Sequence, residues 1–295
     1  MKRAHGRPFA FAASPGPPSA MCTAARDGAP GSSRIIMAQT TVLSSLADRL
    51  TRGDTILSAW CGLPDPSISA VLASEGFDAV TLDMQHGPIT LGEVIRAIPG
   101  INAAGKPALA RIAVGEFQNV SRLFDAGASG VIAPMINTIE DAKLFANYAK
   151  YPPIGERSWG SYGGLGASGL DANAYLREAN RFQLSFAMIE TREAMAILDD
   201  ILALEGIDAV FVGPSDLSIA LSGGATVNPT SQEVDDAIRH IVSRASAVGK
   251  PVAIYAQSAE RAKAFVEMGA KVVTVMSDAN LLRVATKQAL QIIRG

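Results

Sequence analysis

The chain has 295 residues and a formal net charge of −2 at pH 7, a length that suits one large domain or two small ones. No block of basic residues stands out, and no apolar run approaches the roughly 18 to 20 residues of a membrane helix, so we expect neither nucleic acid nor a membrane as a partner. The two cysteines, Cys22 and Cys61, provide no disulfide framework, which favours a reducing, cytoplasmic location.

The first part of the chain, residues 1–36, differs in composition from everything that follows. It is rich in Ala, Gly, Pro, Ser and Arg and shows no apolar period, which predicts a disordered N-terminal extension. Its basic, acid-poor character also resembles a transit peptide. The alternative that we favour is that translation begins at Met37.

The rest of the chain, residues 41–295, is regular. An apolar stripe over residues 42–50 predicts an N-terminal helix that ends at Gly53 and caps the domain. Eight short apolar runs follow, separated by amphipathic segments of helix length. The runs cover residues 56–61, 79–83, 108–112, 130–135, 184–190, 209–213, 252–256 and 272–277. Such continuous apolarity is typical of parallel strands that are buried on both faces.

This alternation predicts an α/β protein built as a single (β/α)8 barrel, the TIM barrel fold, over residues 41–295. A doubly wound sheet is the alternative, but no Gly-x-Gly-x-x-Gly motif follows the first strand. The connection between the fourth and fifth strands, residues 151–181, is long and contains several Gly and Pro residues. Because long loops in compact domains are usually functional, we take this segment as a candidate active-site loop.

Candidate site residues lie at the carboxyl ends of the predicted strands, where an α/β barrel has its active site. They are Trp60, Asp83 and His86, Arg111, Glu190, and Gly213 through Ser215 and Asp216. A charge inside a buried strand, such as Arg111 or Glu190, is costly unless it is paired or bound to a metal. Glu190 and Asp216 come from neighbouring strands and could share one divalent cation, for which Mg²⁺ or Mn²⁺ suits two carboxylates better than zinc does.

Structural interpretations compete with these functional ones. Glu190 could simply form an ion pair with Arg111, and Asp83 could be a turn residue. The convergence of several charged residues on one end of the barrel favours a functional site. Asp125 ends a helical segment, where an acid gains nothing from the helix dipole, so we expect its partner elsewhere in the molecule. No lysine follows a strand, which disfavours a Schiff-base aldolase.

Several sequence blocks, in this order, resemble the HpcH/HpaI aldolase family of metal-dependent class II pyruvate aldolases. The blocks are Gly76-Phe77-Asp78, Asp83-x-x-His86, Arg111, Asp125-x-Gly127, Pro134-Met135, residues 151–157, Ile189-Glu190, and residues 205–217. The resemblance runs from about Val42 to the C-terminus. It implies a homohexamer made of dimers that exchange the C-terminal helix, here roughly residues 279–293.

The resemblance also implies a role for each charged residue of the site. Glu190 and Asp216 would hold Mg²⁺, Mn²⁺ or Co²⁺. Arg111 would bind the keto oxygen and stabilise the enolate. His86 would transfer a proton to and from the substrate hydroxyl, and Asp125, from a neighbouring subunit, would orient His86.

The remaining residues would bind or support the substrate. The backbone N–H groups of Ser215 and Asp216, next to Gly213, would receive the pyruvate carboxylate. Trp60 would line the pocket, and Asp83 would support the site in a way that the sequence does not define.

The reaction that the resemblance implies is the reversible cleavage of a 4-hydroxy-2-oxo acid, of the 2-keto-3-deoxy acid type, to pyruvate and an aldehyde. Two alternatives use the same residues: another pyruvate-enolate lyase, such as an oxaloacetate decarboxylase or an acyl-CoA lyase, and a non-catalytic barrel that binds 2-oxo acids. Gln85 stands where many family members carry Glu, Met188 where some carry Gln, and residues 157–162 also differ from the family pattern. These departures leave the aldehyde partner open.

Overall fold

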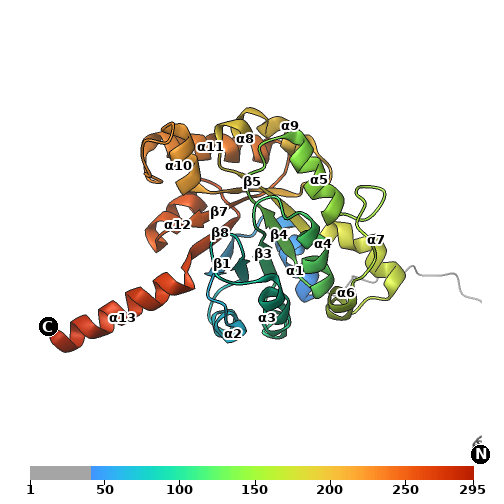
Figure 1. Ribbon diagram of the computed structural model, residues 1–295, viewed down its shortest axis with the longest axis horizontal. Coiled ribbons are helices and arrows are strands. Elements are labelled where there is room, and N and C mark those ends of the chain that lie inside the picture. Colours follow the sequence, from blue (N-terminus) through green and yellow to red (C-terminus); the bar gives the residue numbers. More distant parts are fainter. Residues whose placement is uncertain (1–40) are drawn as a thin grey trace, which may run out of the picture. The chain divides into compact units, whose positions relative to one another are not determined.

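The structure, a computed structural model, describes residues 41–295, and the predicted extension over residues 1–36 lies outside this range. Eight parallel strands form a closed barrel in which each strand pairs with the next along the chain and the last pairs with the first (Figure 1). The predicted (β/α)8 barrel is therefore confirmed. In these residues no helix has the length and apolar character needed to cross a membrane.

Each predicted apolar run contains one strand, which ends at the expected residue or one or two residues earlier. The strands are β1 (Ile56–Cys61), β2 (Ala79–Asp83), β3 (Ala108–Arg111), β4 (Gly130–Ala133), β5 (Leu184–Ile189), β6 (Ala209–Val212), β7 (Val252–Ala256) and β8 (Val272–Ser277). The helices are α1 (Val42–Thr51), α2 (Pro66–Ser74), α3 (Leu91–Ala103), α4 (Gln118–Ala126), α5 (Ile139–Ala149), α6 (Tyr162–Ser168), α7 (Ala172–Phe182), α8 (Arg192–Ala196), α9 (Leu198–Ala203), α10 (Pro214–Leu221), α11 (Gln232–Ala247), α12 (Ala259–Glu267) and α13 (Asp278–Arg294).

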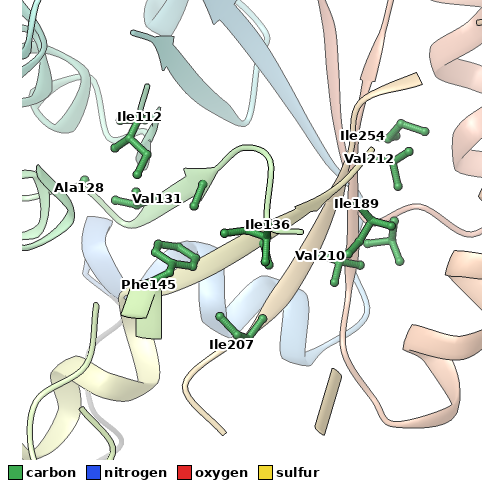
Figure 2. Close-up of a cluster of buried hydrophobic side chains, with 14 of the residues drawn as sticks. Ile112, Ala128, Val131, Ile136, Phe145, Ile189, Ile207, Val210, Val212 and Ile254 are labelled. Carbon is green, nitrogen blue, oxygen red and sulfur yellow. The ribbon is translucent and has the colours of Figure 1, made fainter. Parts of the chain in front are cut away.

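Side chains along each strand alternate between two buried layers, as the pleat of a β-strand requires. In β5, Phe186 and Met188 belong to the cluster inside the barrel, whereas Ala187 and Ile189 belong to the cluster under the helices. Figure 2 shows part of this outer layer, which reaches Phe145 of α5. This alternation decides which side chain at each strand end turns inward.

The predicted capping helix, α1, closes the end of the barrel where the strands begin. It starts at Thr41, whose side chain accepts a hydrogen bond from the N–H of Ser44, while the Ser44 hydroxyl accepts one from the N–H of Thr41. Leu43 and Leu46 of α1 are fully buried in the same cluster as the barrel interior. Within residues 41–295, α1 therefore covers the interior at the end where the strands begin and leaves the carboxyl ends uncovered.

The segment expected to be an active-site loop, residues 151–181, lies elsewhere. It contains α6 and α7, which pack against α1 and α4. Because the segment follows α5, it begins after the chain has already returned to the end where strands start. None of its residues lines the cavity at the opposite end of this chain. The candidate active-site loop therefore does not lie at the cavity of its own chain.

The last helix, α13, has few contacts with the barrel. Its first residue, Asp278, is buried, and Figure 1 shows the rest of the helix (red) extending away from the strands. Apolar side chains along it are exposed, among them Leu282, Val284 and Ile293. An amphipathic helix with an open apolar side is typical of an element that is covered in an assembly.

Candidate active site

A cavity of about 460 Å³ lies at the carboxyl ends of the strands. Most of the residues predicted for the site line it together: Trp60, Asp83, His86, Arg111, Gly213, Ser215 and Asp216. They come from β1, β2 and β3, from the segments that follow β2 and β6, and from the first turn of α10. Strand alternation explains this convergence, because the neighbours of Asp83 and Arg111 on their strands, Leu82 and Ala110, point into the outer layer.

Arg111 is held by Asp83, which faces it across the β2–β3 pair. Arg111 Nε donates to Asp83 Oδ1 over 2.8 Å, and Arg111 Nη2 donates to Asp83 Oδ2 over 2.7 Å. The indole N–H of Trp60 also donates to Asp83 Oδ2, over 3.2 Å, and the guanidinium lies 4.8 Å from the centre of the Trp60 ring.

This arrangement gives Asp83 the role that the sequence left undefined. A two-pronged ion pair fixes the plane of the guanidinium. It uses Nε and Nη2, so that Nη1 keeps its protons for a ligand in the cavity. Arg111 therefore pairs with Asp83, and the alternative in which its ion-pair partner is Glu190 is wrong.

Glu190 follows β5 and points inward, with only 1% of its surface exposed. Its Oε1 accepts a 2.9 Å hydrogen bond from the N–H of Met135, which adopts a left-handed backbone with φ of 55°. Its Oε2 is buried and has no hydrogen-bond partner within residues 41–295. Burial raises the pKa of Glu190 to about 7, and the negative charge of Asp216 adds to the effect, while the Met135 N–H opposes it.

Gly213 allows this close approach. A Cβ atom at position 213 would lie only 2.5 Å from Glu190 Oε2, so any larger residue would displace the carboxylate. A buried carboxylate oxygen without a donor, beside a second carboxylate, is a costly arrangement unless a cation lies there. The residues present therefore fit a hard divalent cation with oxygen ligands.

Asp216 lies in the first turn of α10, which begins directly after β6 with Gly213 as N-cap and Pro214 as its first residue. The N–H groups of the first turn have no partner inside the helix and favour an anion. Within residues 41–295 no group of three or more His, Cys, Asp or Glu side chains forms a metal site. A cation at Glu190 and Asp216 would thus take water or substrate oxygens as further ligands.

His86 and Asp125 do not meet within one chain. His86 lies in the loop after β2, is exposed, and lines the cavity, where its side chain has no hydrogen bond to another residue of the described range. Asp125 lies near the end of α4, where the strands begin, and pairs with Arg157 over 2.8 Å. The role of Asp125 across a subunit boundary therefore stays a prediction.

The model of the HpcH/HpaI aldolase/citrate lyase family matches residues 57–285. The chain belongs to this family. It is 38% identical over 238 residues to a hydroxypyruvate/pyruvate aldolase of Rhizorhabdus wittichii, an alignment that covers 81% of this chain and 94% of that protein. It is 33% identical over 232 residues to the 5-keto-4-deoxy-D-glucarate aldolase of Escherichia coli K12, covering 79% and 90%.

Solved structures agree. An HpcH/HpaI aldolase from Desulfitobacterium hafniense superposes with a TM-score of 0.77 at 27% identity, covering 84% of this chain and 95% of that one. The citrate synthase SbnG superposes with a TM-score of 0.76 at 25% identity, covering 85% and 98%. The family predicted from the sequence blocks is confirmed. The predicted class, a carbon–carbon lyase, is confirmed as well, because the sequence relatives are aldolases.

Two cavity residues of this HpcH/HpaI family member were missed by sequence analysis. Asp278, at the start of α13, accepts hydrogen bonds from the N–H groups of Gly62 and Leu63 and ties the loop after β1 to the last helix. Tyr255 of β7 lies edge-on to Trp60 at 5.3 Å, and burial raises the pKa of its hydroxyl. Its inward position follows from strand alternation, a signal that the sequence did contain.

Proposed function

We propose that this chain is a divalent-metal-dependent aldolase that reversibly cleaves a 4-hydroxy-2-oxo acid to pyruvate and an aldehyde. The observation that carries the proposal is the meeting of three features at the carboxyl ends of the strands. The Arg111 guanidinium fixed by Asp83 and the unpaired imidazole of His86 line the cavity, and the bare buried oxygen of Glu190 lies against Gly213 of its lining. Family membership supports the same reaction type.

The residues of the chain divide the chemistry among them. The first-turn N–H groups of Ser215 and Asp216 bind the carboxylate of the 2-oxo acid. Nη1 of Arg111 stabilises the negative charge that develops on the keto oxygen. A divalent cation held by Glu190 and Asp216, Mg²⁺, Mn²⁺ or Co²⁺, would polarise the same keto group as a Lewis acid.

His86 carries the proton. It accepts the proton of the C4 hydroxyl as the C3–C4 bond breaks, so that C4 becomes the aldehyde and the bonding electrons enter the enolate of pyruvate. Return of a proton to C3 yields pyruvate. A histidine suits this two-way transfer because its unperturbed pKa is about 6.5.

We further propose that the active form is a homo-oligomer, a hexamer by the family resemblance. The open apolar side of α13 supports an exchange of this helix with a second copy. The unpaired His86 supports a contribution of Asp125 from a neighbouring subunit. Cysteine usage supports the cytoplasm as its location.

One experiment separates the two halves of the proposed reaction. We expect Arg111→Ala to abolish both pyruvate C3-proton exchange and aldol cleavage, because the enolate loses its counter-charge. His86→Ala should retain exchange and lose cleavage. Arg244→Ala is the matched control, since Arg244 pairs with Asp199 through the same two-pronged geometry on the surface. Equal loss of both activities in the His86 variant would remove its proposed role.

The substrate and the metal are tested together. Pyruvate release is measured from a panel of 4-hydroxy-2-oxo acids and sugar-derived 2-keto-3-deoxy acids, and hydroxypyruvate is added as an alternative donor in the reverse reaction. EDTA treatment should stop turnover, and Mg²⁺, Mn²⁺ or Co²⁺ should restore it. Full activity after chelation would refute the metal requirement.

A further inference from the structure

A second group of polar residues, three of them buried, lies at the end of the barrel opposite the cavity. Its members are Asp125, at the end of α4, Arg157 and Ser161, before α6, and Gln183, directly before β5. Arg157 has 3% of its surface exposed and Gln183 has 1%. None of these residues lines the cavity of its own chain, so the proposed reaction within one chain does not account for them.

Arg157 is immobilised from several sides. Its Nη1 donates to Gln183 Oε1 over 2.6 Å, and its Nη2 donates to Asp125 Oδ1 over 2.8 Å. The guanidinium also stacks on Tyr151, with 4.4 Å to the ring centre. Gln183 is itself fixed, because its amide N–H₂ donates to the carbonyl of Phe124 over 2.9 Å.

Arg157 and Ser161 bond one carboxylate oxygen of Asp125 and leave the other free. Oδ1 accepts from Arg157 and, over 3.3 Å, from the Ser161 hydroxyl. Oδ2 accepts no hydrogen bond from any residue in the range 41–295, and the Asp125 side chain is 17% exposed. Gly160 keeps Oδ2 accessible, because a Cβ atom at that position would lie 3.1 Å from it.

The surface around this oxygen has the character of an interface. Gly160 and Ser161 lie against Asp125, and their neighbours in sequence, Trp159 and Tyr162, are 49% and 70% exposed. Large exposed aromatic residues are enriched in protein–protein contacts. Trp159 is also preorganised, since its ring packs against those of Tyr151 and Tyr175 at 5.8 and 5.9 Å.

We propose that Arg157 is a positioning residue that acts on the active site of a second copy of this chain. It holds Asp125 so that the free Oδ2 meets the exposed imidazole of His86 in the second copy. The inference rests on the proposed function, because it needs His86 as the proton carrier. A carboxylate that accepts one imidazole N–H fixes the tautomer and leaves the other ring nitrogen free for the substrate hydroxyl.

The second copy is the occupant that the charges favour. Three acids line the cavity with His86: Asp83, which Arg111 engages, Asp278, which the N–H groups of Gly62 and Leu63 engage, and Asp216, the proposed metal ligand. Asp125 is an acid with one oxygen to spare at a surface flanked by aromatic side chains. The His86 imidazole therefore has an N–H donor without an acceptor, and Asp125 Oδ2 is an acceptor without a donor.

Arg157→Lys is the informative substitution. Lysine keeps the charge but has a single nitrogen, so it cannot bond Gln183 and Asp125 in the fixed fork or stack on Tyr151. We expect kcat for aldol cleavage to fall about 10- to 100-fold, the range for residues that orient a catalytic group. KM and pyruvate proton exchange should stay within a factor of about 2, and the pH profile of cleavage should shift toward that of Asp125→Asn.

Arg261→Lys is the matched control. Arg261 also pairs with an aspartate, Asp235, over 2.6 Å and stacks on an aromatic ring, that of Phe265, at 4.4 Å. It lies on α12, away from the cavity and from Asp125. A general effect of replacing a stacked, paired arginine would lower the melting temperature in both variants, whereas the loss of cleavage should follow Arg157 alone.

Mixing subunits tests whether Arg157 acts across the boundary. His86→Ala and Arg157→Lys proteins are unfolded together, refolded as a mixture and assayed. Sites that combine the intact His86 of one subunit with the intact Arg157 of another should regain cleavage, in roughly a quarter of all sites for random assembly. No recovery in this mixture, or full cleavage by the Arg157→Lys protein alone, would overturn the proposal.

The same design separates this inference from the proposed function. Recovery in a mixture of His86→Ala with Asp125→Asn, without recovery in the Arg157 mixture, would reject Arg157 and keep Asp125. Absence of metal-dependent proton exchange in the unaltered protein would instead refute the proposed function.

Discussion

The two ends of the barrel bury charges in different ways. At the end where strands begin, the Lys150 ammonium has three acceptors: the carbonyls of Asn180 and Gln183, and Asp208 at 2.5 Å. At the cavity end, Glu190 is equally buried, yet one of its oxygens has no donor within residues 41–295. The comparison shows that burial alone does not mark a functional charge. A buried charge without a hydrogen-bond partner indicates a functional site, because an unpartnered charge costs stability unless a ligand binds to it.

The largest expected effect is on activity at the cavity end. We expect Glu190→Gln to abolish metal-dependent cleavage, because a neutral amide is a poor ligand for a hard divalent cation. The metal-free variant should be as stable as the unaltered protein or more so, since a buried charge has been removed. Calorimetric Mn²⁺ titration and thermal unfolding measure the two quantities. A marked loss of stability in the Glu190→Gln variant would show that Glu190, like Lys150, has a structural role.

The complementary substitution lies at the closed end. Lys150→Met removes the cation, so that the two carbonyls lose this donor and Asp208 keeps only its hydrogen bonds from Ser185. Breaking a buried ion pair in this way typically costs about 3–5 kcal/mol, so the free energy of unfolding should fall by that order. Cleavage per folded molecule should fall far less than in Arg157→Lys, because Lys150 bonds the backbone carbonyl of Gln183 and not the side-chain oxygen that holds Arg157. Denaturant unfolding and kcat at low temperature check both expectations, and a stable but inactive Lys150 variant would contradict them.

The strands and the capping helix were predictable because burial on both faces leaves a strong apolar signal in the sequence. The position of each site residue at a strand end followed from the same runs. Which charges pair was not predictable. Asp83 and Arg111 face each other because of the β2–β3 register, and the sequence contains no direct record of register between parallel strands.

The misplaced segment, residues 151–181, has a simpler explanation. Its length suggested a function, but its place after a helix already put it at the end where strands begin. Whether a segment follows a strand or a helix decides at which end of the barrel it lies, and its composition does not. The sequence predicted that Asp125 has a partner elsewhere in the molecule. The structure shows such a partner in Arg157, which is 32 residues away along the chain.

The smallest expected effect is a pH dependence that belongs to the cavity end alone. Glu190 has a pKa of about 7 in the folded protein, raised from 4.5 mainly by burial. Between these two values the folded state binds more protons than the unfolded state. The metal-free protein should therefore gain stability from this group as pH falls from about 7 to about 4.5, by up to about 1.4 kcal/mol per pH unit.

A bound cation removes this dependence, because it requires the deprotonated carboxylate. With saturating Mn²⁺, Glu190 is deprotonated in the folded and the unfolded state, so its contribution to stability should be flat between about pH 7 and about 4.5, while the apparent metal affinity falls with pH. The melting temperature, measured across this pH range with and without Mn²⁺, should give curves that lie apart near pH 7 and converge as the pH falls. Glu190→Gln should make both curves parallel. Parallel curves in the unaltered protein would mean that Glu190 does not titrate against the metal, and that its free oxygen has another partner.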